Sequence, residues 1–249
     1  MPMLRLPSRC VLLGVLLSLS VASAAADDFR IETKVYVGKS KEPVSQNTTL
    51  FRAGYVYDYL SGPERVTVFD QRGGRFVLLD PERKLRAEVK TEEVRELLEQ
   101  LQDLAGRSSD PTMRFAAHPE FKVTYKDEEL KLDSPHMTYE LKTMDAVSDE
   151  AAQQYHEFSD WYARFNTMAQ RGSAPPFPRL QVNAELAKRG LVPTSVHLST
   201  RGVKAHTEHY VSWRLLDSDH RRIAETANQL ATFQEVDFED LQAPAISKR

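Results

Sequence analysis

The sequence predicts an α+β fold in which a large curved antiparallel sheet, an unclosed half-barrel, carries amphipathic helices packed on its concave face. Three observations support this prediction. Alternating apolar and polar residues mark many short strands, the strands come in runs instead of alternating with helices, and helical periodicity is confined to a few segments. A sheet of about ten strands must twist and curl. We therefore expect a hollow face that the helices cover.

The first strands follow one another directly along the chain. Gly73-Gly74 supplies one turn, because glycine adopts positive φ without strain, and Asp80-Pro81 supplies the next, because proline presets φ. The runs between these turns are apolar or alternating, and 48–60 is rich in aromatic and β-branched residues. The expected consecutive strands cover 29–37, 48–60, 65–70, 75–80 and 84–89.

Helices and further strands follow in the second half of the chain. Helical periodicity predicts helices over 92–105, 149–169 and 184–189, and a closing helix that Ser218 caps. The remaining alternating segments predict strands over 120–126, 128–133, 137–144, 194–200 and 206–216. Residues 171–179 form a short proline-rich connection, and we expect a single α+β domain over 27–249.

Residues 1–26 have the features of a cleaved secretory signal peptide. Arg5 and Arg9 precede an apolar run, and small residues follow it, so we expect cleavage after Ala24 or Ala26. The only cysteine, Cys10, would leave with this segment. The expected location is the periplasm or the exterior, and no later stretch is long enough to predict a transmembrane segment in the mature chain.

Composition and motifs restrict the function. The formal charge of −3, spread without runs, gives no reason to expect nucleic acid as a partner. There is no G-x-S-x-G elbow and no phosphate-cradling glycine pattern, so no catalytic residue and no cofactor is assigned. Asn47-Thr48-Thr49 has the form of a glycosylation acceptor, which matters only in a source that glycosylates.

The histidines do not predict a metal site. His206 and His209 are expected on a strand, where residues three apart point to opposite faces, so one ion could not readily bind both. Asp217 and Asp219 are expected at the start of a helix, where the dipole favours acidic residues. A hydrolase would need at least two of His197, His209 and His220 to meet Asp217 or Asp219 in one pocket.

Aromatic residues give the clearest candidate site. The strand expected over 48–60 places Phe51, Tyr55, Tyr57 and Tyr59 on one face, and the helix expected over 149–169 places Tyr155, Phe158, Tyr162 and Phe165 on one face. The first interpretation is a hydrophobic core between sheet and helix. The second is a lipid-sized cavity lined by these residues, where tyrosine offers apolar area with a polar tip.

The meander "YVYDYL…RVTVFDQRGGRFVLLDPERKLRAEV" resembles the periplasmic lipoprotein carriers of the LolA/LolB-like superfamily and their envelope relatives. The matching piece runs from Phe76 to Val89 with Asp80-Pro81 near its centre, and the likeness extends over 28–145. The resemblance implies an unclosed barrel with a helical lid over an apolar cavity that holds acyl chains, and a carrier or sensor rather than an enzyme. It assigns no binding residue.

These observations favour a soluble binding protein of the cell envelope that holds a lipid, a lipoprotein acyl chain or another amphiphile between sheet and helices. The first alternative is an envelope structural or interaction protein whose core is filled and whose partner is another protein. The second alternative is the histidine- and aspartate-dependent hydrolase.

Overall fold

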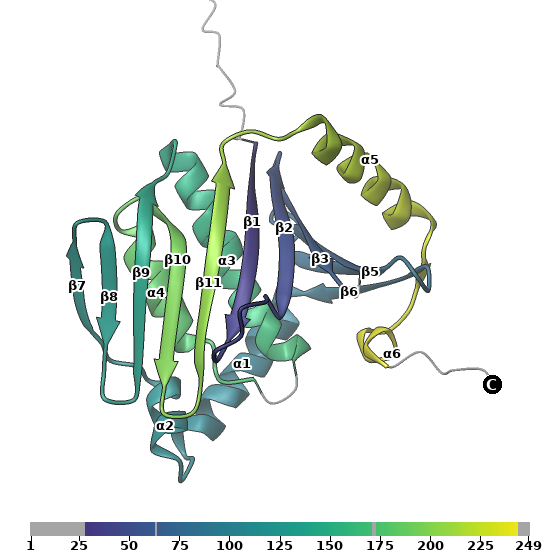
Figure 1. The fold of residues 1–249 in the computed structure, drawn as a ribbon. Coiled ribbons are helices and arrows are strands. Elements are labelled where there is room, and N and C mark those ends of the chain that lie inside the picture. The colour runs from purple at the N-terminus through teal and green to yellow at the C-terminus, as the bar shows by residue number, and fades with distance from the viewer. Residues whose placement is uncertain (1–27, 63, 171–172, 244–249) are drawn as a thin grey trace, which may run out of the picture.

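The fold is seen in a computed structural model that describes residues 28–62, 64–170 and 173–243. The predicted signal peptide lies outside these residues. They form a 12-stranded sheet in the order β12-β6-β5-β4-β3-β2-β1-β11-β10-β9-β8-β7. Neighbouring strands are antiparallel except β12 and β6, which are parallel. Figure 1 shows a strongly curved layer with most of the helices behind it, which confirms the predicted α+β class with an unclosed sheet.

The strands agree with the predicted ones in the main, and the short β12 was not predicted. Their bounds are β1 (Phe29–Val37), β2 (Ser45–Arg52), β3 (Tyr55–Ser61), β4 (Arg65–Asp70), β5 (Arg75–Asp80), β6 (Leu85–Lys90), β7 (Lys122–Lys126), β8 (Glu129–Asp133), β9 (Met137–Asp145), β10 (Leu191–Thr200), β11 (Lys204–Ser212) and β12 (Gln234–Glu235).

A tight hairpin corrects the prediction of one strand over 48–60. Ala53 and Gly54 both adopt positive φ, at 52° and 83°, as in the two-residue turns that suit the twist of a hairpin. The chain therefore folds back, and Phe51 pairs with Val56 while Leu50 pairs with Tyr57. Paired residues share a face, so Phe51 and Tyr57 lie on opposite faces of the sheet.

The helices are α1 (Thr91–Gly106), α2 (Pro111–Ala117), α3 (Asp149–Ala169), α4 (Phe177–Ala187), α5 (Asp217–Thr232) and α6 (Phe238–Gln242). Two of them correct the predicted bounds. α4 begins well before 184, because Pro178 falls in its first turn, where a missing N–H has no cost. α5 begins before Ser218, and the Asp219 carboxylate accepts the Leu216 N–H at 2.8 Å as its cap.

The main core lies between the concave face and α3. Phe158 of α3 meets Phe51 edge-on with ring centroids 5.5 Å apart, and Phe165 stacks on Phe76 of β5 at 4.5 Å. α1 and α4 pack against α3 from behind. Because α3 contacts strands as far apart as β2 and β5, the sheet wraps around this helix.

α5 departs from the prediction that the helices pack on the concave face, because it covers the outer face of the strands β2 to β5. Its Ile223 joins a second buried cluster with Leu50, Val66 and Leu79 of the sheet. The two-sided burial explains the unbroken apolar run of β5, Phe76 to Leu79, and the adjacent buried Val68 and Phe69 of β4. Among the described helices, none has the length and apolar character needed to cross a membrane.

Candidate ligand-binding cavity

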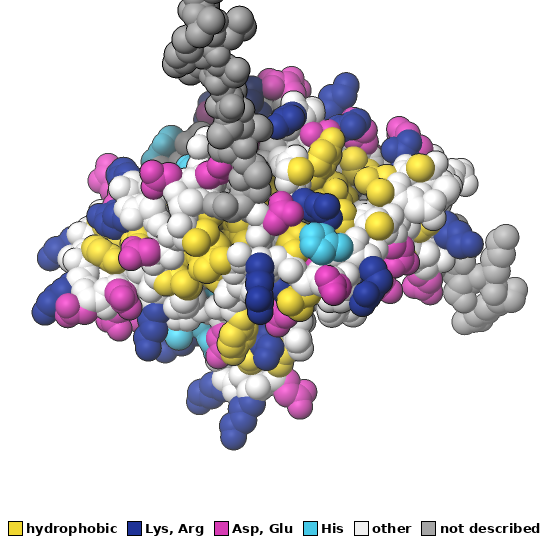
Figure 2. Space-filling view, turned by 90° about the horizontal axis from the view of Figure 1, so that it is seen from above, with side chains coloured by type: hydrophobic (Ala, Val, Ile, Leu, Met, Phe, Trp, Pro, Cys, Tyr) yellow, Lys and Arg dark blue, Asp and Glu magenta, His cyan; other side chains and the backbone are white. Residues whose placement is uncertain are grey.

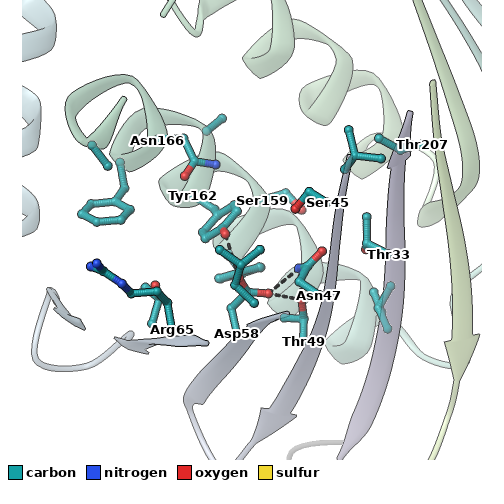
Figure 3. Close-up of a pocket in the computed structure, with 18 of the residues that line it drawn as sticks. Thr33, Ser45, Asn47, Thr49, Asp58, Arg65, Ser159, Tyr162, Asn166 and Thr207 are labelled. Carbon is teal, nitrogen blue, oxygen red and sulfur yellow. Dashed lines mark hydrogen bonds between the residues drawn. The ribbon is translucent and has the colours of Figure 1, made fainter. Parts of the chain in front are cut away.

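A cavity of about 780 Å³ lies between α3 and the concave face of the sheet. Figure 3 shows it from the side, with α3 above and the ends of β1 and β2 below and to the right. Side chains from β1, β2, β3, β4, β5 and β11 form its floor, and α3 forms its roof. The volume is within the range of roughly 300–1,000 Å³ that is typical of small-molecule sites.

One part of the cavity wall is apolar. It is formed by buried side chains from both layers, so the wall is fixed by the main core rather than by mobile loops. Phe158 is held by Phe51 and by Tyr162, whose ring centroid lies 4.9 Å away. The buried apolar lining residues are Ile31, Phe51, Leu78, Tyr155, Phe158 and Phe165.

The centre of the cavity holds a buried carboxylate, Asp58 of β3, whose residue is only 2 % exposed. Its Oδ1 accepts hydrogen bonds from Asn47 Nδ2 at 2.5 Å and from Thr49 Oγ1 at 2.7 Å. Its Oδ2 accepts one from the Tyr162 hydroxyl at 2.7 Å. Figure 3 shows these donors converging on the carboxylate from β2 and α3.

The environment of Asp58 has opposing effects on its ionisation. Burial raises the pKa of its carboxyl group, while the hydrogen bonds from Thr49, Tyr162 and Asn47 favour the charged form and lower it. Burial and the charge of Asp58 raise the pKa of Tyr162 well above its usual range, so its hydroxyl remains a donor. The three donors thus use most of the hydrogen-bond acceptor capacity of the Asp58 carboxylate.

His209 of β11 lies at the side of the cavity formed by β1 and β11. Its Nδ1 is 3.0 Å from Thr33 Oγ1, and its Nε2 is 2.9 Å from Thr207 Oγ1. Burial, with a smaller contribution from the positive charge of Arg179, lowers the pKa of His209 to about 3. The imidazole is therefore neutral at physiological pH, and both ring nitrogens have partners.

Two arginines also line the cavity. Arg65 of β4 pairs with Asp80, with Nη2 3.3 Å from Oδ2. Arg179, in the first turn of α4, is half-buried and has no acidic partner among the residues described. Arg65 thus has an acidic partner, which it shares with Arg83, whereas Arg179 has none among the described residues.

The structure brings part of the predicted aromatic site together. Phe51, Tyr155, Phe158, Tyr162 and Phe165 line the cavity. The predicted placement of the three tyrosines of 48–60 in the same site is wrong. Tyr55, Tyr57 and Tyr59 lie on the outer face of the sheet.

The outer face gives these tyrosines a different role. The Tyr59 hydroxyl is 2.9 Å from Thr226 Oγ1 of α5, and the Arg222 guanidinium lies over its ring at 4.0 Å. Tyr57 packs against the same cluster, and Tyr55 is exposed. Tyr57 and Tyr59 hold α5 to the sheet, and none of the three faces the cavity.

The polar residues of the cavity were not predicted from the sequence. Asp58, Asn47 and Thr49 come together only because the hairpin at Ala53 and Gly54 puts β2 and β3 in register. The turn residues Ala-Gly inside an aromatic run were the available signal. The side chain of Asn47, in the glycosylation-like triplet, is directed towards Asp58.

The histidines do not assemble a catalytic group. As predicted, His206 and His209 lie on opposite faces, and His206 stacks on His197 of the outer face at 5.2 Å. His220 lies in the first turn of α5, outside the cavity, and its Nδ1 is 2.7 Å from Arg52 Nη1. Within the described part of the chain, no three His, Cys, Asp or Glu side chains are arranged to hold a metal ion.

The surface is mixed in charge. Figure 2 shows acidic and basic side chains interspersed with small apolar patches on the face seen from above. A second hollow of about 680 Å³ lies on the far side of α3, between α1, α3 and α4. Its half-buried Trp161 is flanked by Arg95 and Arg164, at 5.9 and 5.1 Å from the ring centroid.

Comparisons with known proteins do not assign the chain to a family. No protein-family model matches the chain, and no curated protein matches its sequence. Among solved structures, a LolA superfamily protein from Nitrosomonas europaea is similar, with 8% identity and a TM-score of 0.31, over 78% of this chain and 89% of that one. A likeness this distant assigns no residue and no ligand, and membership in the superfamily stays a prediction.

Proposed function

We propose that this protein is a secreted or periplasmic binding protein that holds a lipid, a lipoprotein acyl chain or another amphiphile in the cavity between α3 and the concave face of the sheet. The observation that carries the proposal is the cavity itself, of about 780 Å³, with an apolar wall and a polar cluster in one space. An amphiphile has the same division between an apolar and a polar part.

The walls support binding more than catalysis. The carboxylate of Asp58 is used by three donors, and the imidazole of His209 is neutral with both nitrogens engaged. Neither group is positioned as a free base or nucleophile. A rigid aromatic wall, in contrast, gives apolar contact area without a large cost in side-chain entropy.

Filling the cavity tests the proposal. Ala163 lies on α3 and lines the cavity, so Ala163→Phe places a ring in the space a ligand would occupy. We expect at least a tenfold loss of affinity for a fluorescent fatty-acid probe. Because the ring enters a hollow, the free energy of unfolding should change by less than about 1 kcal/mol.

The matched control is Ala224→Phe on the exposed side of α5, which adds the same ring outside the cavity and should leave binding unchanged. Native mass spectrometry of the chain purified from cells, followed by denaturation, identifies any bound molecule. Unchanged binding in Ala163→Phe would place the ligand elsewhere. No bound molecule and no probe binding in the wild-type chain would favour the interaction protein with a filled core.

A further inference from the structure

Arg179 is the one charged group of the cavity wall that no described residue compensates. The charged side chains that line the cavity are Asp58, Arg65 and Arg179. Arg65 pairs with Asp80, and Asp58 receives three hydrogen bonds. For Arg179 there is neither an ion pair nor a hydrogen bond to another described residue.

The surroundings of Arg179 make this lack of a partner costly. The residue is half-buried and lies in the first turn of α4, a turn without acidic residues. The positive end of a helix dipole disfavours a cation there. Its positive charge acts on His209, whose nitrogens are already bound to Thr33 and Thr207, and on the buried Tyr139, neither of which carries a negative charge. A half-buried guanidinium with unused hydrogen-bond donors is stabilised when an anion binds it.

Asp58 is not a comparable site for a cation. Its carboxylate could attract a positively charged ligand, but the hydrogen bonds from Asn47, Thr49 and Tyr162 already occupy both oxygens. A ligand cation would have to displace these donors, whereas an anion at Arg179 displaces only water. The balance of charge therefore favours a negative group on the ligand.

We infer that the ligand of this cavity is an anionic amphiphile, whose carboxylate or phosphate group binds Arg179 while its chain lies against Phe51, Phe158 and Phe165. The inference rests on the proposed function and names its ligand class. The guanidinium presents donors in a planar fork that fits either acid, so the chemistry shared by fatty acids and phosphate monoesters of lipids is what is recognised.

A paired set of probes tests the inference with the full mature chain. The fluorescence of cis-parinaric acid and of its methyl ester reports binding of the same chain with and without the charge. Displacement of the bound methyl ester by lysophosphatidate or by monoacylglycerol makes the same comparison for phosphate. We expect the wild-type chain to bind each acid at least tenfold more tightly than its neutral counterpart.

The variants assign the preference to one side chain. Arg179→Gln should remove the preference for the acid by weakening the binding of the acid far more than that of the methyl ester, and Arg179→Lys should retain part of the preference. Arg65→Gln is the matched control, because it removes a cavity arginine that already has a partner. It should keep the preference for the acid. Circular dichroism of each variant checks that it is folded.

The outcomes separate the two proposals. Equal binding of acid and ester by the wild-type chain, or an unchanged preference in Arg179→Gln, would overturn the inference while cavity binding stands. If neither the acids nor their neutral counterparts bind, both the inference and the proposed function fail. A preference for only one of the two acids, lost in Arg179→Gln, supports the inference and identifies the source of the anion.

Discussion

Replacing Tyr162 by phenylalanine removes one hydroxyl from the centre of the cavity and leaves the aromatic ring in place. That hydroxyl donates to Asp58 Oδ2 at 2.7 Å, and it links α3 to β3. The ring of Tyr162 still packs on Phe158, so the shape of the apolar wall is retained. The change therefore isolates the hydrogen bond to a buried carboxylate.

The size of the effect follows from burial and charge. A hydrogen bond to a charged group contributes about 1.5–3 kcal/mol, and removing a donor from a buried carboxylate leaves that oxygen without compensation. Asp58 is 2 % exposed, so water replaces the lost donor poorly. We expect Tyr162→Phe to lower the free energy of unfolding by about 2 kcal/mol, or the melting temperature by roughly 4–8 °C for a chain of this size.

The loss should depend on pH in a defined direction. Burial raises the pKa of Asp58 above its ordinary value of 3.8. At a pH above the raised pKa the buried carboxylate is charged, which lowers the free energy of unfolding. As pH falls through the raised pKa, the carboxylate is protonated and this loss of stability disappears. The Tyr162 hydroxyl offsets part of that cost by favouring the charged form. The effect of Tyr162→Phe should therefore be greatest at pH 7 and smaller once Asp58 is protonated.

Urea denaturation followed by circular dichroism at pH 7 and pH 4 measures both quantities. The matched control is Tyr210→Phe, because the exposed Tyr210 hydroxyl also donates to a carboxylate, Glu208, at 3.2 Å. We expect that control to change stability by less than about 0.5 kcal/mol. The reasoning is refuted if both variants lose the same stability at pH 7, or if the loss in Tyr162→Phe grows at pH 4.

Two further predictions concern groups outside the Asp58 cluster. The pKa of His209 is about 3 in the folded chain against an ordinary value of 6.5, so the free energy of unfolding falls as pH is lowered from 6.5 to 3. The urea midpoint of His209→Gln should therefore fall less steeply over this pH range than that of the wild type. Parallel plots of urea midpoint against pH would contradict this. Asp219 caps α5 and accepts from Arg30 at 3.2 Å, so Asp219→Ala should cost about 2 kcal/mol and increase hydrogen exchange in α5. The exposed Asp217→Ala is its control, and equal effects of the two would contradict the assigned cap and ion pair.

The sheet could be predicted from the sequence because most of its turns carry glycine or proline between alternating runs. The hairpin turn at Ala53 was not predicted, because alanine rarely adopts positive φ and only Gly54 interrupts the aromatic run. α4 was shortened in the prediction because its prolines were interpreted as a linker. In the first case alanine adopts a conformation that it rarely takes, whereas in the second the prolines lie at a helix start, a position that suits them.

The site was predictable only as far as it lies on one helix. Helical spacing placed Tyr155, Phe158, Tyr162 and Phe165 together, and all of them line the cavity. The polar cluster joins β3 to a residue of α3 that is 104 positions away in the chain. No spacing rule connects such positions, so the register of β2 on β3 and the placing of α3 had to be known first.

The hollow itself has a cause in the sequence of the inward positions. Where β4 and β5 face α3 they carry Phe69 and Phe76, which stack on one another at 4.6 Å and fill the space. Farther along β1 and β2, beyond Ile31 and Phe51, and on β11, small polar residues face the space, and it stays open; these are Thr33, Ser45, Asn47, Thr49 and Thr207.

Such a choice of residues has a physical consequence. Small hydroxyl and amide side chains give hydrogen-bonding groups to a hollow, and a polar hollow of this size is filled by water in the absence of a ligand. A ligand that enters must replace those hydrogen bonds on one side and can gain apolar contact with Phe158 and Phe165 on the other. A purely apolar molecule would meet only the second condition, which is why the walls favour an amphiphile over a hydrocarbon.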